Sequence, residues 1–242
     1  MNGGATAGPG AGTLPEDQVR AMFDRIAGVY DLMNSVMTAG LHHRWRERAV
    51  DLAAVGPGDR VLDVATGTGD LAIALKRRVG RDGEVVGTDF SERMLELARA
   101  KTDDVDFETG NALDLPYADD SFDAATVGFG ARNFADLARG LSEMGRVVRP
   151  GGRVVVLELT TPERPPLSWF YRLWFDRLVP TLGRVAGDAE AYSYLPSSVR
   201  RFPGARGLAA AMAAVGLVRV RWILTAGGII AIHAGEVEEG GS

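Results

Sequence analysis

The segment that most restricts the fold is a glycine-rich turn that follows a short apolar stretch. Residues 60–64 have the pattern of a buried strand, and the run Ala65-Thr66-Gly67-Thr68-Gly69 separates them from an apolar helical pattern over 71–79. Glycines at such a turn allow left-handed backbone conformations and let a ligand approach the main chain closely. The segment therefore predicts a strand, a ligand-binding turn and a helix in direct succession.

Strands and helices alternate along the rest of the central chain. Short apolar runs predict strands at 84–88, 105–108, 122–127 and 153–159, and amphipathic segments predict helices at 91–101 and 134–148. The run 153–159 is dominated by Val and Leu, which is typical of a strand buried on both faces. This alternation predicts βαβ units, and therefore a doubly wound α/β fold with a mostly parallel sheet.

The two ends of the chain predict further elements around this sheet. Before it we expect helices at 15–27 and 46–54, with an irregular or short-helical segment between them. After it we expect helices at 167–182 and 208–215, separated by an irregular polar segment at 188–203. Residues 218–224 and 228–233 predict an antiparallel hairpin. A parallel sheet closed by such a hairpin favours the seven-stranded topology of methyltransferases over that of dehydrogenases.

The length of 242 residues suits one domain, or one domain with a small lid. We expect a single domain over 14–235, in which residues 14–54 form a helical N-terminal lid and residues 161–207 form a helical insertion. The Gly- and Ala-rich residues 1–13 and the acidic residues 236–242 predict disordered tails.

Composition excludes several classes of site. The sequence has no cysteine, which excludes disulfides and thiolate metal ligands, and we expect no metal site. A formal net charge of −5, with Lys and Arg spread along the chain, argues against nucleic-acid binding. The sequence also lacks a secretory signal pattern and an apolar run of ~20 residues, so we expect a cytoplasmic protein.

Two carboxylates near the ends of the first two strands predict polar contacts with a cofactor. Asp89 follows Gly69 by twenty positions, where it can accept hydrogen bonds from both ribose hydroxyls. This spacing also matches the dinucleotide fingerprint, so NAD remains an alternative. Asp63 is placed to hold the charged amino-acid end of a sulfonium cofactor, and Asn111-Ala112 to flank an adenine ring. With the run Arg149-Pro150-Gly151-Gly152 before the fifth strand, these residues favour S-adenosylmethionine over NAD.

Each of these residues also has a purely structural interpretation. The two glycines can form a tight turn without any ligand. Asp63 can cap a helix, and Asp89 can belong to the N-cap region of the helix that follows Ser91. Asn111 can simply occupy a turn, where Asn is common.

Longer motifs resemble one known family. They are Tyr30-Asp31-Leu32-Met33-Asn34 with Met37-Thr38, His42 and Trp45; Phe129-Gly130-x-Arg132-Asn133; Arg146 to Gly152 with Leu157-Glu158; and Ala191-Tyr192-x-Tyr194-Leu195-x-x-Ser198-Val199. In this order and spacing, over roughly residues 16 to 234, the chain resembles the quinone-biosynthesis C-methyltransferases. These are the demethylmenaquinone and 2-polyprenyl-6-methoxybenzoquinol methyltransferases.

The resemblance implies a class I methyltransferase fold, related to the Rossmann fold, and a defined cofactor site. That site would bind S-adenosylmethionine through Asp63, Thr66, Gly67, Thr68, Gly69, Asp89, Met94, Asn111, Ala112 and Gly128. Three departures from the family pattern, Thr38, Arg149 and Thr160, keep a hydroxyl or a charge. Gly128 stands where a Ser is common, so a side-chain hydrogen bond is lost there.

The resemblance also implies the reaction, which is methylation of a ring carbon of a prenylated quinol. That carbon becomes nucleophilic when the ring hydroxyl loses its proton, so the enzyme must align two substrates and favour the quinolate. Arg132 can stabilise the quinolate, Asn133 can orient the ring oxygen, and His42 or His43 can accept the proton, with Tyr30 or Asp31 positioning either group.

Structural alternatives remain for these candidates too. Arg132 can instead pair with Asp136, and His42 can be a packing or capping residue. Tyr30 and Trp45 can belong to the core of the lid. If Arg132 acts in catalysis, Arg132→Ala lowers kcat strongly and leaves cofactor affinity mostly intact.

A prenyl tail requires an apolar channel or access to a bilayer. Residues 167–178 are rich in aromatic side chains and include Arg172 and Arg177. This composition suits peripheral contact with the inner face of the plasma membrane. A buried helix or a homodimer contact is an alternative explanation for the same residues. The substrate favoured here is demethylmenaquinol. The alternatives are a benzoquinol of ubiquinone biosynthesis, another small hydrophobic acceptor, a cofactor-binding scaffold without catalysis, and an NAD oxidoreductase.

Overall fold

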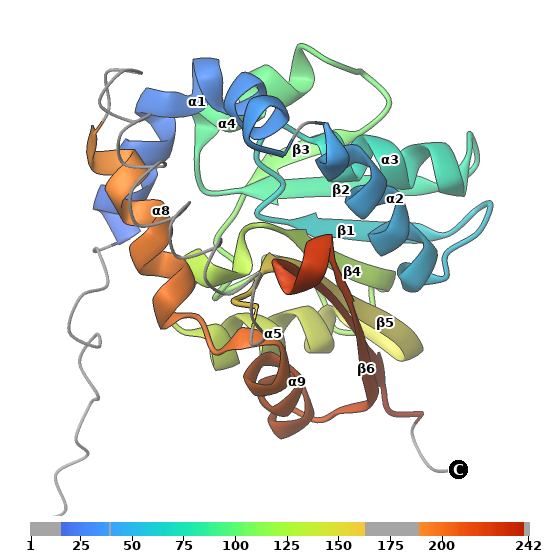
Figure 1. The fold of residues 1–242 in the computed structure, drawn as a ribbon. Helices are drawn as coiled ribbons and strands as arrows, with labels where there is room; N and C mark the ends of the chain where they lie inside the picture. The colour runs from blue at the N-terminus through green and yellow to red at the C-terminus, as the bar shows by residue number, and fades with distance from the viewer. Residues whose placement is uncertain (1–15, 39, 163–188, 240–242) are drawn as a thin grey trace, which may run out of the picture.

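In residues 16–38, 40–162 and 189–239, which the computed structural model describes, seven strands form one sheet in the order β3-β2-β1-β4-β5-β7-β6 (Figure 1). Neighbouring strands from β3 to β5 pair in parallel, and β7 pairs antiparallel with both β5 and β6. The strands are β1 (Arg60–Val64), β2 (Glu84–Asp89), β3 (Asp106–Thr109), β4 (Phe122–Gly128), β5 (Val148–Leu159), β6 (Leu217–Thr225) and β7 (Ile230–Val237). The predicted doubly wound sheet with a C-terminal antiparallel hairpin is confirmed.

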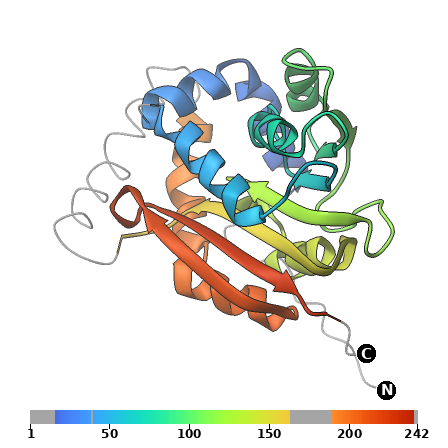
Figure 2. The ribbon, with the colours of Figure 1, turned by 90° about the vertical axis from the view of Figure 1, so that its right-hand side faces the viewer.

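The C-terminal hairpin forms one edge of the sheet (Figure 2). A short 3-10 helix, η3 (Ala226–Gly228), joins β6 to β7. β7 extends through Val237, two residues past the expected end of the domain at 235. Within this extension Glu236 pairs with Arg153 at 3.3 Å and with Arg219 at 2.5 Å, so it belongs to the sheet and not to a tail.

Helices cover both faces of the sheet. The face in contact with α2 (Leu41–Ala53), α3 (Asp70–Val79) and α4 (Glu92–Arg99) buries one apolar cluster. The opposite face buries a second cluster under α5 (Leu137–Val147) and α9 (Gly204–Ala214). The two layers agree with the doubly wound arrangement, because each βαβ unit places its helix on one face or the other.

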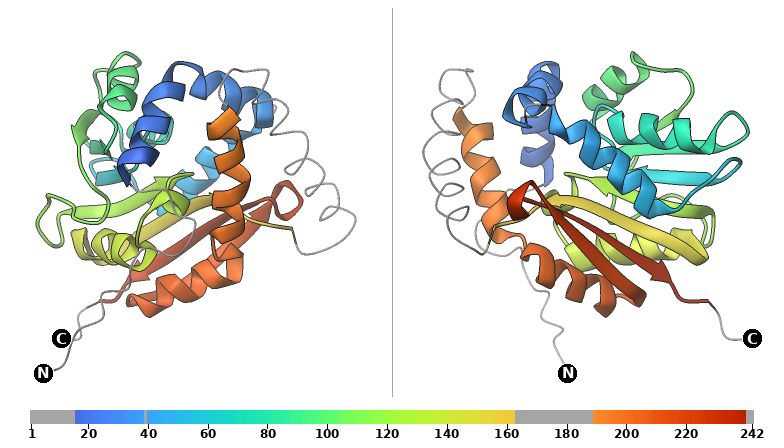
Figure 3. Two further views of the ribbon diagram at one scale, coloured as in Figure 1. Left: turned by 90° about the vertical axis from the view of Figure 1, so that its left-hand side faces the viewer. Right: turned by 45° about the vertical axis from the view of Figure 1, so that its right-hand side comes forward.

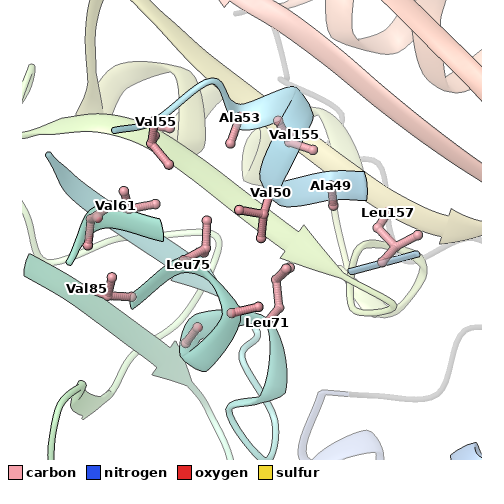
Figure 4. Close-up of a cluster of buried hydrophobic side chains, with 14 of the residues drawn as sticks. Ala49, Val50, Ala53, Val55, Val61, Leu71, Leu75, Val85, Val155 and Leu157 are labelled. Atoms are coloured by element: carbon pink, nitrogen blue, oxygen red, sulfur yellow. The ribbon is translucent and has the colours of Figure 1, made fainter. Parts of the chain in front are cut away.

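The first cluster places α2 firmly in the core. Ala49, Val50 and Ala53 of α2 lie against Val155 and Leu157 of β5 (Figure 4). All five side chains are almost completely buried. This half of the expected N-terminal lid is therefore a fixed layer of the domain.

The segment expected to be irregular or short-helical is helical, and the prediction of irregular structure at 188–203 was wrong. The first helix, α1 (Glu16–Thr38), does not stop at residue 27 but continues to Thr38, and α2 begins at Leu41, after Gly40 with φ of 74°. The polar segment 188–203 is mostly helix, as α8 (Ala189–Arg201) with Pro196 inside it. Helix α1 contacts both α2 and α8 (Figure 3), and such tertiary contacts outweigh weak local preferences. The expected helix at 167–182 lies outside the described residues.

Candidate active site

One cavity lies at the carboxyl ends of β1, β2 and β4, which in a doubly wound fold is the usual place for a ligand. Its described lining comes from the turn after β1, the end of β2, the loop after β3, the segment after β4, and the N-terminal helices α1 and α2. Nine of the ten predicted cofactor residues line it: Asp63, Thr66, Gly67, Thr68, Asp89, Met94, Asn111, Ala112 and Gly128. The tenth, Gly69, is part of the turn but not of the lining.

The two glycines of the turn have different physical roles. Both adopt positive φ, 57° at Gly67 and 80° at Gly69. A Cβ atom added at Gly67 would meet no atom within 4 Å, so the space beside this glycine is open to a ligand. A Cβ atom at Gly69 would lie 2.7 Å from Cζ of Phe107, so this glycine is required for packing.

Asp89 holds the turn and the start of α4 together. Its Oδ2 accepts a hydrogen bond from the backbone N–H of Gly67 at 2.8 Å, and its Oδ1 accepts one from the backbone N–H of Ser91 at 2.9 Å. Burial raises the pKa of Asp89 to about 6, although the backbone N–H donors oppose the rise. Its two carboxyl oxygens are acceptors, so this position suits ribose hydroxyls.

Asp63 lies at the centre of the site. Its carboxylate accepts hydrogen bonds from Oγ1 of Thr66 at 2.7 Å and from Oγ1 of Thr126 at 2.6 Å. Burial raises its pKa to about 6 despite these two hydrogen bonds. Asp63 does not cap a helix, because both of its donors are threonine hydroxyls.

Apolar side chains surround the part of the cavity next to Asn111 and Ala112. Phe90 and the buried Met94 line it, and Phe23 of α1 packs edge-on against Phe90 with ring centroids 6.5 Å apart. Oδ1 of Asn111 accepts a hydrogen bond from the backbone N–H of Leu113 at 2.8 Å. This combination of apolar side chains with the amide of Asn111 suits a purine ring.

The segment after β4 forms the remaining wall. Phe129 adopts a φ of 61°, and Asn133 of η1 (Ala131–Asn133) lines the cavity. The hydroxyl of Tyr194, on α8, donates a hydrogen bond to Oδ1 of Asn133 at 3.1 Å. At Gly128, a Cβ atom would lie 3.1 Å from Cδ2 of Leu71, so a side chain there requires Leu71 to shift slightly.

Comparison with known proteins bears directly on this site. Residues 12–237 match the ubiE/COQ5 methyltransferase family. The chain belongs to this family. It is 48% identical to the demethylmenaquinone methyltransferase of Thermus thermophilus over 220 residues, covering 89% of this chain and 99% of the relative. It is 39% identical to the ubiquinone/menaquinone biosynthesis C-methyltransferase UbiE of Teredinibacter turnerae, covering 90% of this chain and 91% of the relative.

Solved structures agree on the fold. A methyltransferase of Thermotoga maritima, described as S-adenosylmethionine-dependent, superposes with a TM-score of 0.64 at 21% identity, covering 89% of this chain and 98% of that one. Membership of the ubiE/COQ5 methyltransferase family makes the NAD oxidoreductase alternative wrong.

The structure places Arg132 differently from either sequence-based interpretation. Its Nη1 donates to Oε1 of Glu158 at 2.7 Å and to the carbonyl of Phe129, and the Arg132 and Glu158 side chains are only 7% and 1% exposed. The Asp136 carboxylate caps α5 by accepting from the backbone N–H of Arg139. Arg132 also does not line the cavity. Its effect on the quinolate stays a prediction.

The predicted base candidates lie away from the lining. His42 is buried in α2, and its Nδ1 lies 2.7 Å from Oγ1 of Thr38. His43 packs against it with ring centroids 4.0 Å apart. Neither histidine lines the cavity, and the side chains of Tyr30 and Asp31 are outside the described part. Trp45 lies in the first core cluster, edge-on to Phe129.

Sequence reasoning missed several residues of the site. Phe23, Arg46, Asp70 and Phe90 line the cavity, and Nη1 of Arg46 lies 3.1 Å from Oδ2 of Asp70. The available signal was Arg46 itself, one position after Trp45 of the family motif. In the described residues no group of three or more His, Cys, Asp or Glu side chains is arranged to hold a metal ion. No helix within 16–38, 40–162 or 189–239 is long and apolar enough to cross a membrane.

Proposed function

We propose that this protein transfers a methyl group from S-adenosylmethionine to a ring carbon of demethylmenaquinol, in menaquinone biosynthesis. Three relatives between 42% and 48% identical carry the name demethylmenaquinone methyltransferase. Relatives 39% identical carry the name UbiE, so a benzoquinol of ubiquinone biosynthesis is the alternative acceptor.

The observation that carries the proposal is a single cavity lined both by Asp89 and Gly67 and by Asn133. The residues present fit S-adenosylmethionine: open space beside Gly67 for the cofactor chain, the carboxyl oxygens of Asp89 for the ribose, and Phe90 beside Asn111 for the adenine. The cofactor supplies a methyl group on a positively charged sulfur.

The protein's own groups then align and polarise the acceptor. Oδ1 of Asn133 already accepts from Tyr194, so the amide N–H₂ of Asn133 is the group left to donate to the ring oxygen. A fixed donor at that oxygen stabilises the charge that develops when the hydroxyl is deprotonated. Holding the ring carbon in line with the methyl group contributes to the rate by itself, by up to ~7–11 kcal/mol.

Purified protein incubated with methyl-labelled S-adenosylmethionine tests this function. We expect labelled menaquinol from demethylmenaquinol and little product from the corresponding demethylated benzoquinol. Predominant benzoquinol methylation supports the alternative acceptor. Cofactor binding without methylation of either quinol points to another acceptor or to a scaffold.

The place of action follows from the acceptor. We propose a cytoplasmic protein that meets its prenylated substrate at the inner face of the plasma membrane, because a prenyl tail partitions into lipid. Flotation with liposomes that contain demethylmenaquinone tests this. Protein that remains entirely in the dense fraction contradicts membrane contact, and sedimentation equilibrium separately decides between a monomer and a homodimer.

A further inference from the structure

Helix α2 places one buried cation in the wall of the cavity. Arg46 is 8% exposed and is the one cationic side chain among the described residues that line the cavity. Its neighbours Ala49 and Val50 are buried in the core, and Trp45 packs edge-on against Phe129. The backbone that carries Arg46 is therefore fixed relative to the sheet.

The contacts of Arg46 leave a donor available. Its Nη1 lies 3.1 Å from Oδ2 of Asp70, but this ion pair lacks hydrogen-bond geometry. Among the described residues Nη1 has no hydrogen-bond partner, and it is shielded from solvent. A buried guanidinium N–H without an acceptor is costly, so this atom points to an acceptor that a ligand would bring.

The charges around Arg46 favour an anion. Asp70 is shared, because Nζ of Lys101 also donates to its Oδ1 at 2.7 Å. Arg46, Lys101 and Asp70 together carry a formal charge of +1, so the Asp70 carboxylate alone does not neutralise the two cations. Burial raises the pKa of Asp70, but the charges of Arg46 and Lys101 outweigh burial and hold that pKa below its usual range. Asp70 therefore stays ionised and holds the two cations in place.

The position of the Arg46 guanidinium suits the carboxylate end of a zwitterionic amino acid. Asp70 is the first residue of α3, so Arg46 lies where the positive end of the helix dipole also favours an anion. The carboxylate of Asp63 lines the same cavity, close enough for the charge of Arg46 to act on it. A cation and a carboxylate lining one cavity suit the carboxylate and the ammonium of an amino acid.

We propose that Arg46 binds the carboxylate of the methionine moiety of S-adenosylmethionine, and that Asp63 faces the ammonium group. This inference rests on the cofactor named in the proposed function. It makes α2, outside the glycine-rich turn, part of the cofactor site. Affinity should then depend on Arg46 only for ligands that carry the carboxylate.

Three ligands that differ in this group provide the test. S-adenosylhomocysteine carries both the carboxylate and the ammonium, its decarboxylated analogue keeps only the ammonium, and 5′-methylthioadenosine has neither. Isothermal titration calorimetry measures Kd for each with wild type, Arg46→Met and Arg46→Lys. Arg44→Met is the matched control, because Arg44 is exposed on the same helix.

We expect Arg46→Met to weaken binding of S-adenosylhomocysteine about 10–100-fold, as for the loss of a charge-assisted hydrogen bond. Binding of 5′-methylthioadenosine and of the decarboxylated analogue should change less than about twofold, within ordinary surface-mutation effects. Arg46→Lys should recover part of the loss, because an ammonium keeps the charge but not the paired donors. Arg44→Met should behave as wild type with all three ligands.

Two outcomes overturn the proposal. An equal loss for all three ligands means that Arg46 maintains the shape of the cavity, and no loss for any means that it does not contact the cofactor. A thermal unfolding curve for each variant distinguishes global unfolding from a local effect. Wild type that fails to bind S-adenosylhomocysteine contradicts the proposed function as well. Wild type that binds it but methylates no quinol contradicts only the proposed acceptor.

Discussion

The carboxylate of Asp89 accepts a hydrogen bond from the backbone N–H of Gly67 at 2.8 Å, across 22 positions of sequence. The same carboxylate accepts from the N–H of Ser91 with its other oxygen. One side chain at the end of β2 thus holds both the glycine-rich turn after β1 and the first turn of α4. Gly67 and Asp89 both line the cavity, so this connection fixes part of its wall.

Asp89→Asn should damage both folding and binding. An amide has one acceptor oxygen, so it can satisfy Gly67 or Ser91 but not both, and its N–H₂ would face a backbone donor. We expect a loss of about 1–3 kcal/mol in the free energy of unfolding, the usual cost of an unsatisfied buried group. Urea denaturation measures this loss, and calorimetry should show weaker S-adenosylhomocysteine binding. Unchanged affinity would mean that Asp89 serves only the turn.

The two glycines of the turn offer a matched pair of substitutions. Gly69→Ala introduces a Cβ atom 2.7 Å from Cζ of Phe107 at a residue with a φ of 80°. We expect the free energy of unfolding to fall by several kcal/mol. The positive φ contributes about 1–2 kcal/mol of this loss, and the steric overlap with Phe107 contributes about 1–3 kcal/mol. Gly67→Ala meets no atom within 4 Å and should cost only the backbone part. Its methyl group instead occupies the open space, so cofactor affinity should fall more than stability. Equal melting temperatures for the two variants would contradict this distinction.

The buried pair of Arg132 and Glu158 complicates the interpretation of any Arg132 variant. Removing one partner leaves a buried charge uncompensated, so Arg132→Gln should lose about 3–5 kcal/mol of stability. Combining it with Glu158→Gln should recover much of that loss, because no buried charge remains. If Arg132 also stabilises the quinolate, kcat stays low in the stable double variant while cofactor affinity is kept. Recovery of kcat together with stability would remove Arg132 from the chemistry.

Tyr194→Phe tests the contact with Asn133. It deletes the hydroxyl that donates to Oδ1 of Asn133, and with it a hydrogen bond to Arg201, so the Asn133 amide becomes free to turn its oxygen toward the cavity. We expect kcat to fall about 10-fold, since a misoriented donor costs a kcal/mol or more, with unchanged Kd for S-adenosylhomocysteine. Single-turnover methylation separates the chemical step from product release. A change in cofactor affinity instead of kcat would contradict a role at the acceptor end.

The raised pKa of Asp63 predicts a pH-dependent stability of the free protein. Burial raises this pKa from 3.8 to about 6, so between those values the folded state binds more protons than the unfolded state. The contribution of Asp63 to stability is therefore fully present below the unfolded pKa and is lost as pH rises through about 6. Asn does not titrate, so Asp63→Asn lacks this loss.

The measurable quantity is the free energy of unfolding of Asp63→Asn minus that of wild type. We expect it to rise by about 1 kcal/mol between about pH 5 and pH 7 in the absence of ligand. Urea denaturation across this range provides the values. A difference that stays flat, or falls with pH, contradicts a raised pKa at Asp63.

Local patterns in the sequence were enough for the sheet and for most of the residues that line the cavity. The strand of residues 60–64 and the glycines at 67 and 69 are recognisable because strand periodicity and positive φ are properties of a few adjacent residues. The lengths of α1 and α8 were not recognisable in this way. Both helices include residues with weak helix preference, such as Gly28 and Pro196, and contacts between the two helices compensate for them.

The sequence by itself thus determined the alternation of elements, the glycine-rich turn and, through its motifs, the family. Only the tertiary structure decided which partner each polar side chain takes. Arg132 pairs with Glu158 across 26 positions, Tyr194 with Asn133 across 61, and Arg46 reaches Asp70 from a separate helix. These pairings depend on strand order and on how helices pack over the sheet ends. No local pattern of charge or hydropathy encodes that information, because the partners are neighbours only after the chain has folded.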